Sequence, residues 1–136
     1  MVRNRKLNSR STFRLALENR GIRLNIGAKS SDIARLESII RATISPSIRE
    51  VMELFDGFSD DFDRDSFISV WNIDKIISRI DSKRLPYIPF ADRGLDAEIL
   101  EVCAIDDDKP VLIDGVESFP SYLQFWDSIL SNSIPF

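Results

Sequence analysis

The sequence predicts an α+β fold in which a mainly antiparallel sheet is packed by N-terminal helices and by a C-terminal helix with an aromatic face. Three observations lead to this prediction. Apolar residues recur at helical spacing over residues 11–57, and short β-branched runs separated by turn sequences occupy residues 87–113. Residues 118–130 carry an apolar stripe rich in aromatic rings. A stripe of that width has to be covered, and only a sheet is large enough to cover it.

Helical signals dominate the first half of the chain. A short helix is expected over residues 11–20, followed by a half-buried extended segment at residues 22–26, where apolar and polar residues alternate. A second helix is predicted over residues 30–40, because its isoleucine and leucine residues fall on one face. A third helix is predicted to begin at Ser45-Pro46, since a proline in the first turn loses no hydrogen bond, and to end before Gly57.

The second half is predicted to contain the sheet and two further helices. Residues 67–71 have the composition of a strand, after which Asn72 can cap a fourth helix. The strand that starts at Tyr87 is expected to run into an exposed turn at residues 91–94. The last helix is expected to begin at Ser118, with a proline in its first turn. The three strands of the meander are expected at residues 87–90, 99–105 and 110–113.

Charge is distributed unevenly along the chain. Residues 1–23 contain seven Lys and Arg residues against one acid, whereas the remaining residues contain eleven against twenty-one acids. This acidic body disfavours nucleic acid as a direct partner and favours a partner with a basic surface. Residues 1–12 are interpreted as a basic, frayed leader within a single domain that comprises residues 1–136.

The sequence also predicts a cytoplasmic protein without contact to a membrane. No apolar run is long enough to span a bilayer, and no apolar segment follows the basic N-terminus as a secretion signal would require. The single cysteine, Cys103, lies in an apolar run and is expected to be a buried thiol.

Several classes of chemistry lack their usual residues. The chain contains no histidine, which excludes nucleophilic catalysis by a serine or cysteine with a histidine base. One cysteine cannot form a structural zinc site, and five scattered glycines form no phosphate-binding loop. The sequence therefore predicts a protein that is not an enzyme and has no cofactor or metal. An enzyme with a pair of catalytic carboxylates is the alternative.

The acidic segment at residues 59–66 has more than one interpretation. Asp61, Asp63 and Asp65 have the spacing that opens a calcium-binding loop, but Ser66 and Asn72 stand where such a loop needs glycine and glutamate. We interpret the segment as a solvated loop, with partner binding as the alternative. The aspartates that precede Lys109 are explained by a hairpin turn.

The two tryptophans have different predicted environments. Trp126 lies on the apolar stripe of the last helix and is assigned to the core. Trp71 closes a strand beside a helix cap and is expected to be more open. Neither has the polar neighbours that a carbohydrate site would need.

Five motifs follow one another in a distinctive order. They are IARLE at 33–37, SPSIREVMELFDGF at 45–58, SVWNIDKII at 69–77, PYIPFADRGLDAEILEVCAIDDDKPVLIDG at 86–115 and SFPSYLQFWDSIL at 118–130. In this order they resemble the SMI1/KNR4 family, also called the SUKH superfamily, over most of the chain. Ile44-Ser45-Pro46 departs from the Leu-Pro corner of the family, and Asp56-Gly57-Phe58 departs from its Asn-Gly-Gly. Both departures keep the helix-starting proline and the helix-ending glycine.

The resemblance implies an α+β domain that binds protein, namely an immunity protein that neutralises a cognate toxin by occlusion. Bacterial members of the family are commonly encoded beside such toxins, many of which are nucleases with basic faces that an acidic domain would suit. A regulatory or scaffolding interaction domain of the same fold is the alternative. The chain is expected to be a monomer or a weak homodimer.

A partner is expected to contact the acidic loops, with an aromatic side chain as a possible anchor. The turn at residues 91–94 is one such contact, although a plain connection is the simpler interpretation. The candidate contact residues are Asp60, Asp61, Asp63, Asp65, Trp71, Tyr87, Asp92, Asp96, Asp106, Asp107 and Asp108.

Overall fold

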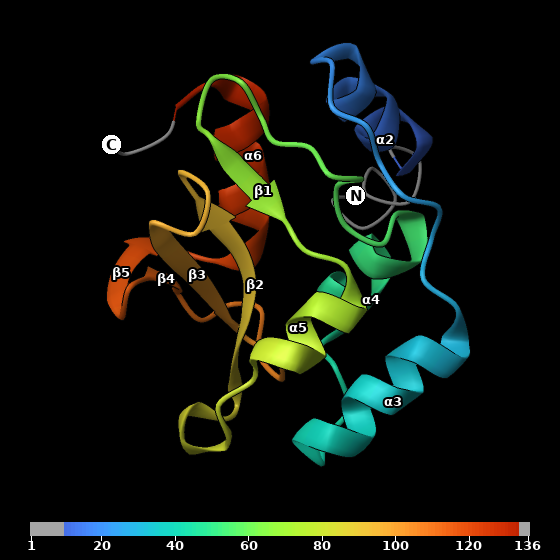
Figure 1. Cartoon of the computed structure of the whole chain (residues 1–136), viewed down its shortest axis with the longest axis vertical. Coiled ribbons are helices and arrows are strands. Elements are labelled where there is room, and N and C mark those ends of the chain that lie inside the picture. The colour runs from blue at the N-terminus through green and yellow to red at the C-terminus, as the bar shows by residue number, and fades with distance from the viewer. Residues whose placement is uncertain (1–9, 134–136) are drawn as a thin grey trace.

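The computed structural model describes residues 10–133, the side chains of residues 10 and 11 excepted, and confirms the predicted α+β architecture (Figure 1). Residues 1–9 of the predicted leader lie outside the described residues, and residues 10–12 are helical. Within the described part of the chain, no helix is both long and apolar enough to cross a membrane. The elements are α2 (Arg10–Asn19), α3 (Ser30–Ile40), α4 (Pro46–Leu54), β1 (Ile68–Val70), α5 (Ile73–Arg79), a 3₁₀ helix η1 (Ser82–Arg84), β2 (Tyr87–Arg93), β3 (Glu98–Cys103), β4 (Val111–Ile113), β5 (Val116–Phe119) and α6 (Tyr122–Ser131).

The sheet is an antiparallel meander in which each strand pairs with the next one along the chain, in the order β1-β2-β3-β4-β5. β3 lies at its centre, and Leu100 and Val102 on this strand are buried, as predicted for a covered strand. Cys103 is a buried free thiol, as the sequence indicated.

β2 extends further than the sequence predicted. Residues 91–93 pair with β1 on one side and with β3 on the other, so the strand ends at Arg93. Pro89 lies at a bulge and outside the β1 ladder, so its missing N–H leaves no β1 residue unpaired. The prediction of an exposed turn is therefore wrong at residues 91–93, which belong to the strand. Ala91 and Asp92 are buried in the sheet.

The end of the chain contains a strand that the sequence did not predict. The turn at residues 114–115 has positive φ at both positions, 49° and 83°, and joins β4 to β5 as a tight hairpin. Residues 116–119 then pair with β4. The predicted helix start at Ser118 is wrong, because α6 begins after this strand, where the Ser121 hydroxyl accepts a hydrogen bond from the Gln124 N–H at 3.2 Å.

The turn between β3 and β4 caps α4. The Asp107 carboxylate accepts hydrogen bonds from the Ser45 hydroxyl and, at 3.3 Å, from the Ser47 N–H. A carboxylate here satisfies a helix N–H that has no partner within the helix and interacts favourably with the helix dipole. The Asp107 carbonyl also accepts a hydrogen bond from the Tyr122 N–H at 3.1 Å. Asp107 therefore fastens α4 and α6 to the sheet, a role that fits it better than partner contact.

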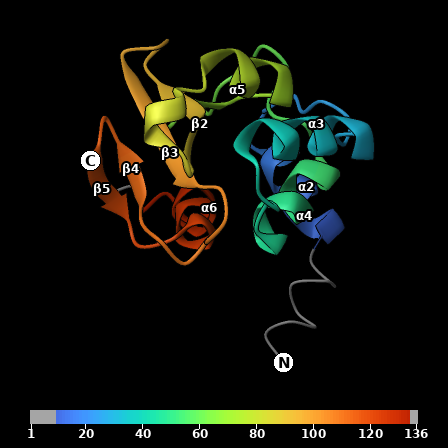
Figure 2. The ribbon, with the colours of Figure 1, turned by 90° about the horizontal axis from the view of Figure 1, so that it is seen from below.

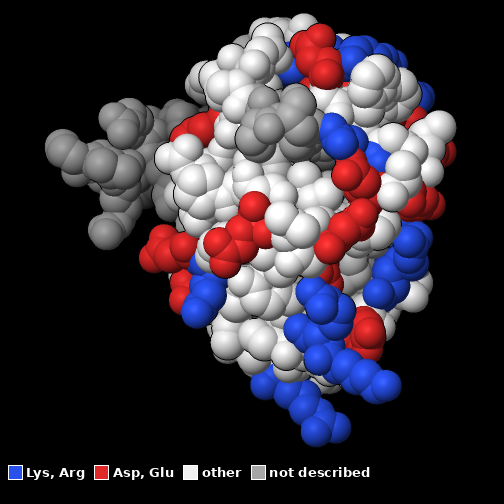
Figure 3. All heavy atoms as spheres, turned by 90° about the vertical axis from the view of Figure 1, so that its left-hand side faces the viewer, with Lys and Arg blue, Asp and Glu red and all other residues white. Residues whose placement is uncertain are grey.

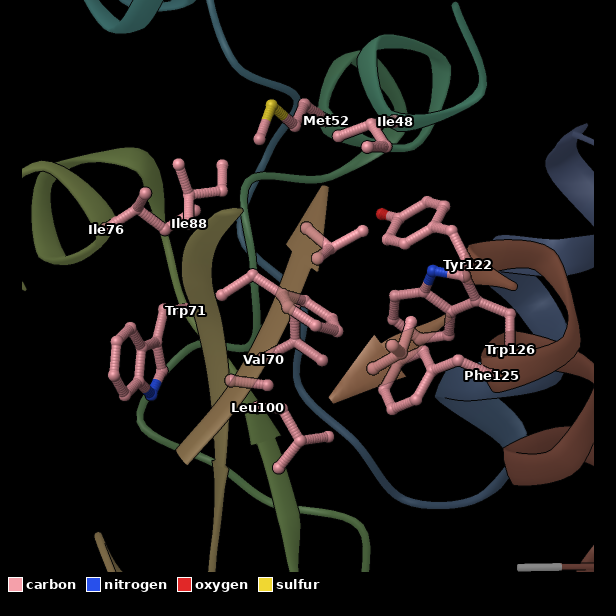
Figure 4. Close-up of a cluster of buried hydrophobic side chains, with 14 of the residues drawn as sticks. Ile48, Met52, Val70, Trp71, Ile76, Ile88, Leu100, Tyr122, Phe125 and Trp126 are labelled. Atoms are coloured by element: carbon pink, nitrogen blue, oxygen red, sulfur yellow. The ribbon is translucent and has the colours of Figure 1, made fainter. Parts of the chain in front are cut away.

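The core lies where α6 packs between the sheet and helices α2 and α4 (Figure 2). The Phe125 ring is within 5.2 Å, centroid to centroid, of Phe90, Phe119 and Trp126. Figure 4 shows Trp71 on the other side of β2 from Phe125 and Trp126. The two tryptophans are 4% and 2% exposed, so Trp126 belongs to the core as predicted, and the prediction of a more open Trp71 is wrong.

Candidate functional site

Two loops meet at the end of the sheet where β1 begins and β2 ends. They comprise residues 59–67 and residues 94–97, and together they are named the loop tip. The Gly94 N–H donates to the Phe67 carbonyl at 3.0 Å, so the loops lie side by side (Figure 1). The loop tip contains three of the predicted contact acids that are exposed, which are Asp60, Asp65 and Asp96.

Apolar side chains are exposed on the loop tip. Leu95 is 86% exposed and Phe67 is 58% exposed. The Phe67 ring stacks on Phe62 with the centroids 6.1 Å apart, and the Arg64 guanidinium lies 4.4 Å from the centroid of Phe62. Large apolar side chains that are open to solvent are typical of a surface that binds another protein.

The backbone of the loop tip adopts an unfavourable conformation. Asp60, Phe67, Leu95 and Asp96 have φ between 48° and 71°, in the left-handed region. Aspartate tolerates this region, but for phenylalanine or leucine it costs about 1–2 kcal/mol. The fold therefore loses stability at the two residues whose apolar side chains it exposes. Such local strain is often retained because the residues have a function.

Buried carboxylates brace the first loop. Asp63 accepts a hydrogen bond from the Arg20 guanidinium at 2.8 Å. Asp61 accepts one from the Arg64 side chain at 2.6 Å and one from the Arg23 N–H at 2.7 Å. Both acids are buried, so the prediction of a solvated loop is wrong at these positions. They fix the loop to the end of α2 and to the segment after it.

The calcium-like spacing in this loop produces ion pairs with arginine. Asp61 pairs with Arg64, and Asp63 and Asp65 both pair with Arg20, at 2.8 and 3.1 Å. Within residues 10–133, no group of three or more His, Cys, Asp or Glu side chains is arranged to hold a metal ion.

Trp71 and Asp92 brace the second loop. The indole N–H donates to one Asp92 carboxylate oxygen at 2.6 Å, and the other oxygen accepts a hydrogen bond from the Asp96 N–H at 3.1 Å. Lys75 and Arg79 lie over the indole at 4.6 and 4.8 Å from its centroid. Because Trp71 and Asp92 are buried, they position the loop and are not exposed to a partner.

The remaining candidate contacts lie at the other end of the sheet. Tyr87 begins β2, is half-buried, and its hydroxyl lies 3.5 Å from the Pro110 carbonyl; burial raises the pKa of this tyrosine. Asp106 and Asp108 lie in the β3–β4 turn with Asp107. The structure thus separates the predicted contact residues into two groups that do not share a surface.

The acidic composition does not produce a uniformly acidic face. Figure 3 shows acidic side chains scattered over the face it presents, with basic side chains gathered at the lower end. Lys83 and Arg84 on η1 are among the exposed basic residues of the described chain. Charge alone therefore does not single out one surface as a candidate for binding.

Sequence reasoning missed the two apolar residues of the loop tip. The β propensity of Phe67 predicts a strand residue, and the turn sequence around Leu95 predicts a plain connection. A signal was nevertheless present at Leu95. It is a large apolar residue between Gly94 and Asp96, within a sequence that otherwise has the composition of a turn.

Replacing Leu95 with asparagine is expected to stabilise the fold by up to about 1 kcal/mol, because asparagine tolerates the left-handed conformation. Urea denaturation of both proteins measures the difference. Ile26→Asn is the control, since Ile26 is 77% exposed and has no positive φ. The control is expected to change stability by less than about 0.5 kcal/mol. A loss of stability in Leu95→Asn would argue against strain at this residue.

Acid pH is expected to weaken the bracing at Asp61. Burial acts to raise the pKa of this carboxyl, but hydrogen bonds from Arg64 and from the N–H groups of Arg23 and Phe62 outweigh it and lower the pKa to about 2. The folded-state pKa is below the unfolded value of about 3.9. The ionised carboxylate therefore stabilises the fold above about pH 4, and this contribution is lost as the pH falls towards 2.

Asp61→Asn is thus expected to flatten the dependence of the unfolding free energy on pH between about pH 2 and 4. Denaturant titrations across this range measure the slope. Ser69→Ala is a matched control. The Ser69 hydroxyl donates to the Asp61 carbonyl at 2.7 Å, so its loss also weakens the loop, but serine does not titrate in this pH range. The control should lower stability without changing the slope. Equal slopes for wild type and Asp61→Asn would contradict this account.

Two comparisons with known proteins were without a match. No protein-family model matches this chain, and no curated protein is significantly similar to it. The SUKH resemblance therefore stays a prediction from the motifs.

Proposed function

We propose that this chain is an immunity protein of the SUKH type that binds a cognate toxin domain through the loop tip and blocks it by occlusion. The observation that carries the proposal is the pair of exposed apolar side chains, Phe67 and Leu95, held in a left-handed backbone. Buried hydrogen bonds at Asp63 and Asp92 order the loops before any partner arrives. An ordered contact surface loses less conformational entropy on binding, which increases affinity.

Exposed acids stand in the same two loops as the apolar pair. Asp65 and Asp96 make ion pairs with Arg20 and Arg79, and both stay more than half exposed. Asp60 is exposed as well. An apolar centre with a charged rim is the usual anatomy of a protein interface, in which the rim steers association and the centre supplies affinity. A toxin with a basic substrate-binding face, such as a nuclease, would complement this rim.

Occlusion requires no catalytic group in the protein that binds. This requirement agrees with a chain that contains no histidine and whose acids at the loop tip are engaged in bracing or lie on the rim. The protein would act by covering the surface that the toxin uses for its own substrate.

Co-expression tests the proposal. The C-terminal domain encoded by the neighbouring reading frame is expressed in a test bacterium, with and without this chain, and survivors are counted. We expect death with the neighbour alone and survival when both are present. A harmless neighbour, or one that kills regardless, would contradict the proposal and favour a regulatory interaction domain of the same fold.

A further inference from the structure

A groove lies between helices α2, α4 and α6, which run close together in Figure 2. Its volume is about 260 Å³, and side chains from all three helices form its apolar floor. The floor includes Phe13, Val51, Leu54, Trp126 and Leu130. Neither loop of the loop tip contributes a residue to the groove, so it is a separate surface.

The charged side chains that line the groove are acids. Glu50 stands on α4 and Asp127 on α6, and no Lys or Arg is among the described residues that line it. Neither carboxylate makes an ion pair with a described residue, in contrast to most acids around the loop tip. The groove therefore combines an apolar floor with negative charge contributed by two different helices.

The size and lining of the groove favour protein side chains over a small molecule. Small-molecule sites usually have volumes of about 300–1,000 Å³ and several convergent polar groups. This groove is smaller, and its other lining residues with a polar group are Thr12, Ser47 and Trp126. Apolar side chains one turn apart on a helix commonly fill a groove of this kind between helices.

We propose that this groove docks an amphipathic α-helix of a partner protein. Apolar residues at helical spacing would enter the floor, and Lys or Arg residues on both flanks of that stripe would pair with Glu50 and Asp127. The groove is small for an interface, so binding in the micromolar range is expected. This inference does not depend on the proposed immunity function, because it rests on the groove alone.

A pair of synthetic peptides provides the probe. Each has about 18 residues, long enough to form a helix, and carries leucines at i, i+3, i+4 and i+7. One peptide has lysines on both flanks of the stripe, and the other has glutamates at the same positions. Binding to the full chain is measured by calorimetry, and methyl NMR locates it through Val51, Leu54 and Leu130.

The lysine peptide is expected to bind at least tenfold more tightly than the glutamate peptide and to shift these methyl signals. In the double variant Glu50→Lys/Asp127→Lys, the glutamate peptide should bind more tightly than the lysine peptide. Only a folded groove can reverse the preference in this way, so unfolding of the variant could not explain the result. The matched control, Asp108→Lys/Glu117→Lys, reverses two exposed acids elsewhere and should leave the preference unchanged.

Three outcomes would overturn the proposal. The two peptides could bind equally well, or the shifted signals could lie outside the groove. Alternatively, the groove could already be filled, either by a second copy of the chain or by residues 1–9. Light scattering of the full chain detects a second copy. A gain in peptide binding when residues 1–9 are deleted detects occupation by that segment.

Discussion

Replacing Phe125 with alanine is expected to destabilise the protein by about 3–5 kcal/mol, the range seen when a buried aromatic ring is deleted. Phe125 is completely buried, and its ring makes edge-to-face contacts with Phe90, Phe119 and Trp126. The truncation would leave a cavity where α6 meets the sheet. Domains of this size are typically stable by only about 5–15 kcal/mol, so a large part of the total would be lost. Urea denaturation measures the change.

Phe67→Ala is the matched control for this prediction. It is the same chemical change at a phenylalanine that is more than half exposed, so it should cost less than about 1 kcal/mol. Equal losses at the two positions would contradict the assignment of Phe125 to the core and of Phe67 to the surface.

Replacing Gly57 with alanine is expected to have the second large effect. Gly57 has φ of 74°, and an added Cβ would lie 2.5 Å from the carbonyl carbon of Trp71 and 2.6 Å from the Asn72 nitrogen. Both neighbours are backbone atoms, so the junction between β1 and α5 would have to shift. The left-handed backbone costs alanine about 1–2 kcal/mol, and the shift of the junction adds to this cost. We therefore expect the free energy of unfolding to fall by more than about 2 kcal/mol.

Gly21→Ala isolates the conformational part of that loss. Gly21 has φ of 86°, but an added Cβ would meet no atom within 4 Å. It should therefore cost only about 1–2 kcal/mol. The difference between the two variants measures the close approach of Gly57 to the start of α5. If Gly57→Ala lowered the free energy of unfolding no more than Gly21→Ala, the close approach of Gly57 to the Trp71–Asn72 backbone would be contradicted.

The sequence predicts best the elements whose defining residues lie close together along the chain. Ile33, Leu36 and Ile40 repeat on one face of α3, and Asn72 caps α5 with a hydrogen bond from the Lys75 N–H at 2.8 Å. Both signals lie within a few residues of the structure they specify. The predictions that failed concern pairing at longer range, since β5 forms only because a two-residue turn returns it to β4.

Burial of charge was unpredictable for the same reason. Asp63 is buried because Arg20, which is 43 residues earlier, supplies a guanidinium to it. Asp92 is buried because the indole of Trp71, which is 21 residues earlier, donates to it. An acidic loop without such partners would be solvated, and nothing in the local sequence distinguishes the two cases.

The candidate site was only half predictable. Asp60, Asp65 and Asp96 were identified as exposed acids from their loop sequences, which is a local property. The exposure of Phe67 and Leu95 depends on a left-handed backbone set by the meeting of two loops. Apolar residues are assigned to the core by default, so their exposure appears only in the three-dimensional structure.

If Phe67 and Leu95 bind the proposed partner, the double variant Phe67→Asn/Leu95→Asn should lose most of that binding. Asparagine suits the left-handed backbone, so the fold should be preserved while both apolar contacts are lost. The matched control, Ile26→Asn/Val116→Asn, removes two exposed apolar side chains elsewhere. Affinity for the proposed toxin domain is measured by calorimetry for all three proteins. We expect at least tenfold weaker binding for the double variant and wild-type binding for the control. Wild-type affinity in the double variant would contradict this expectation.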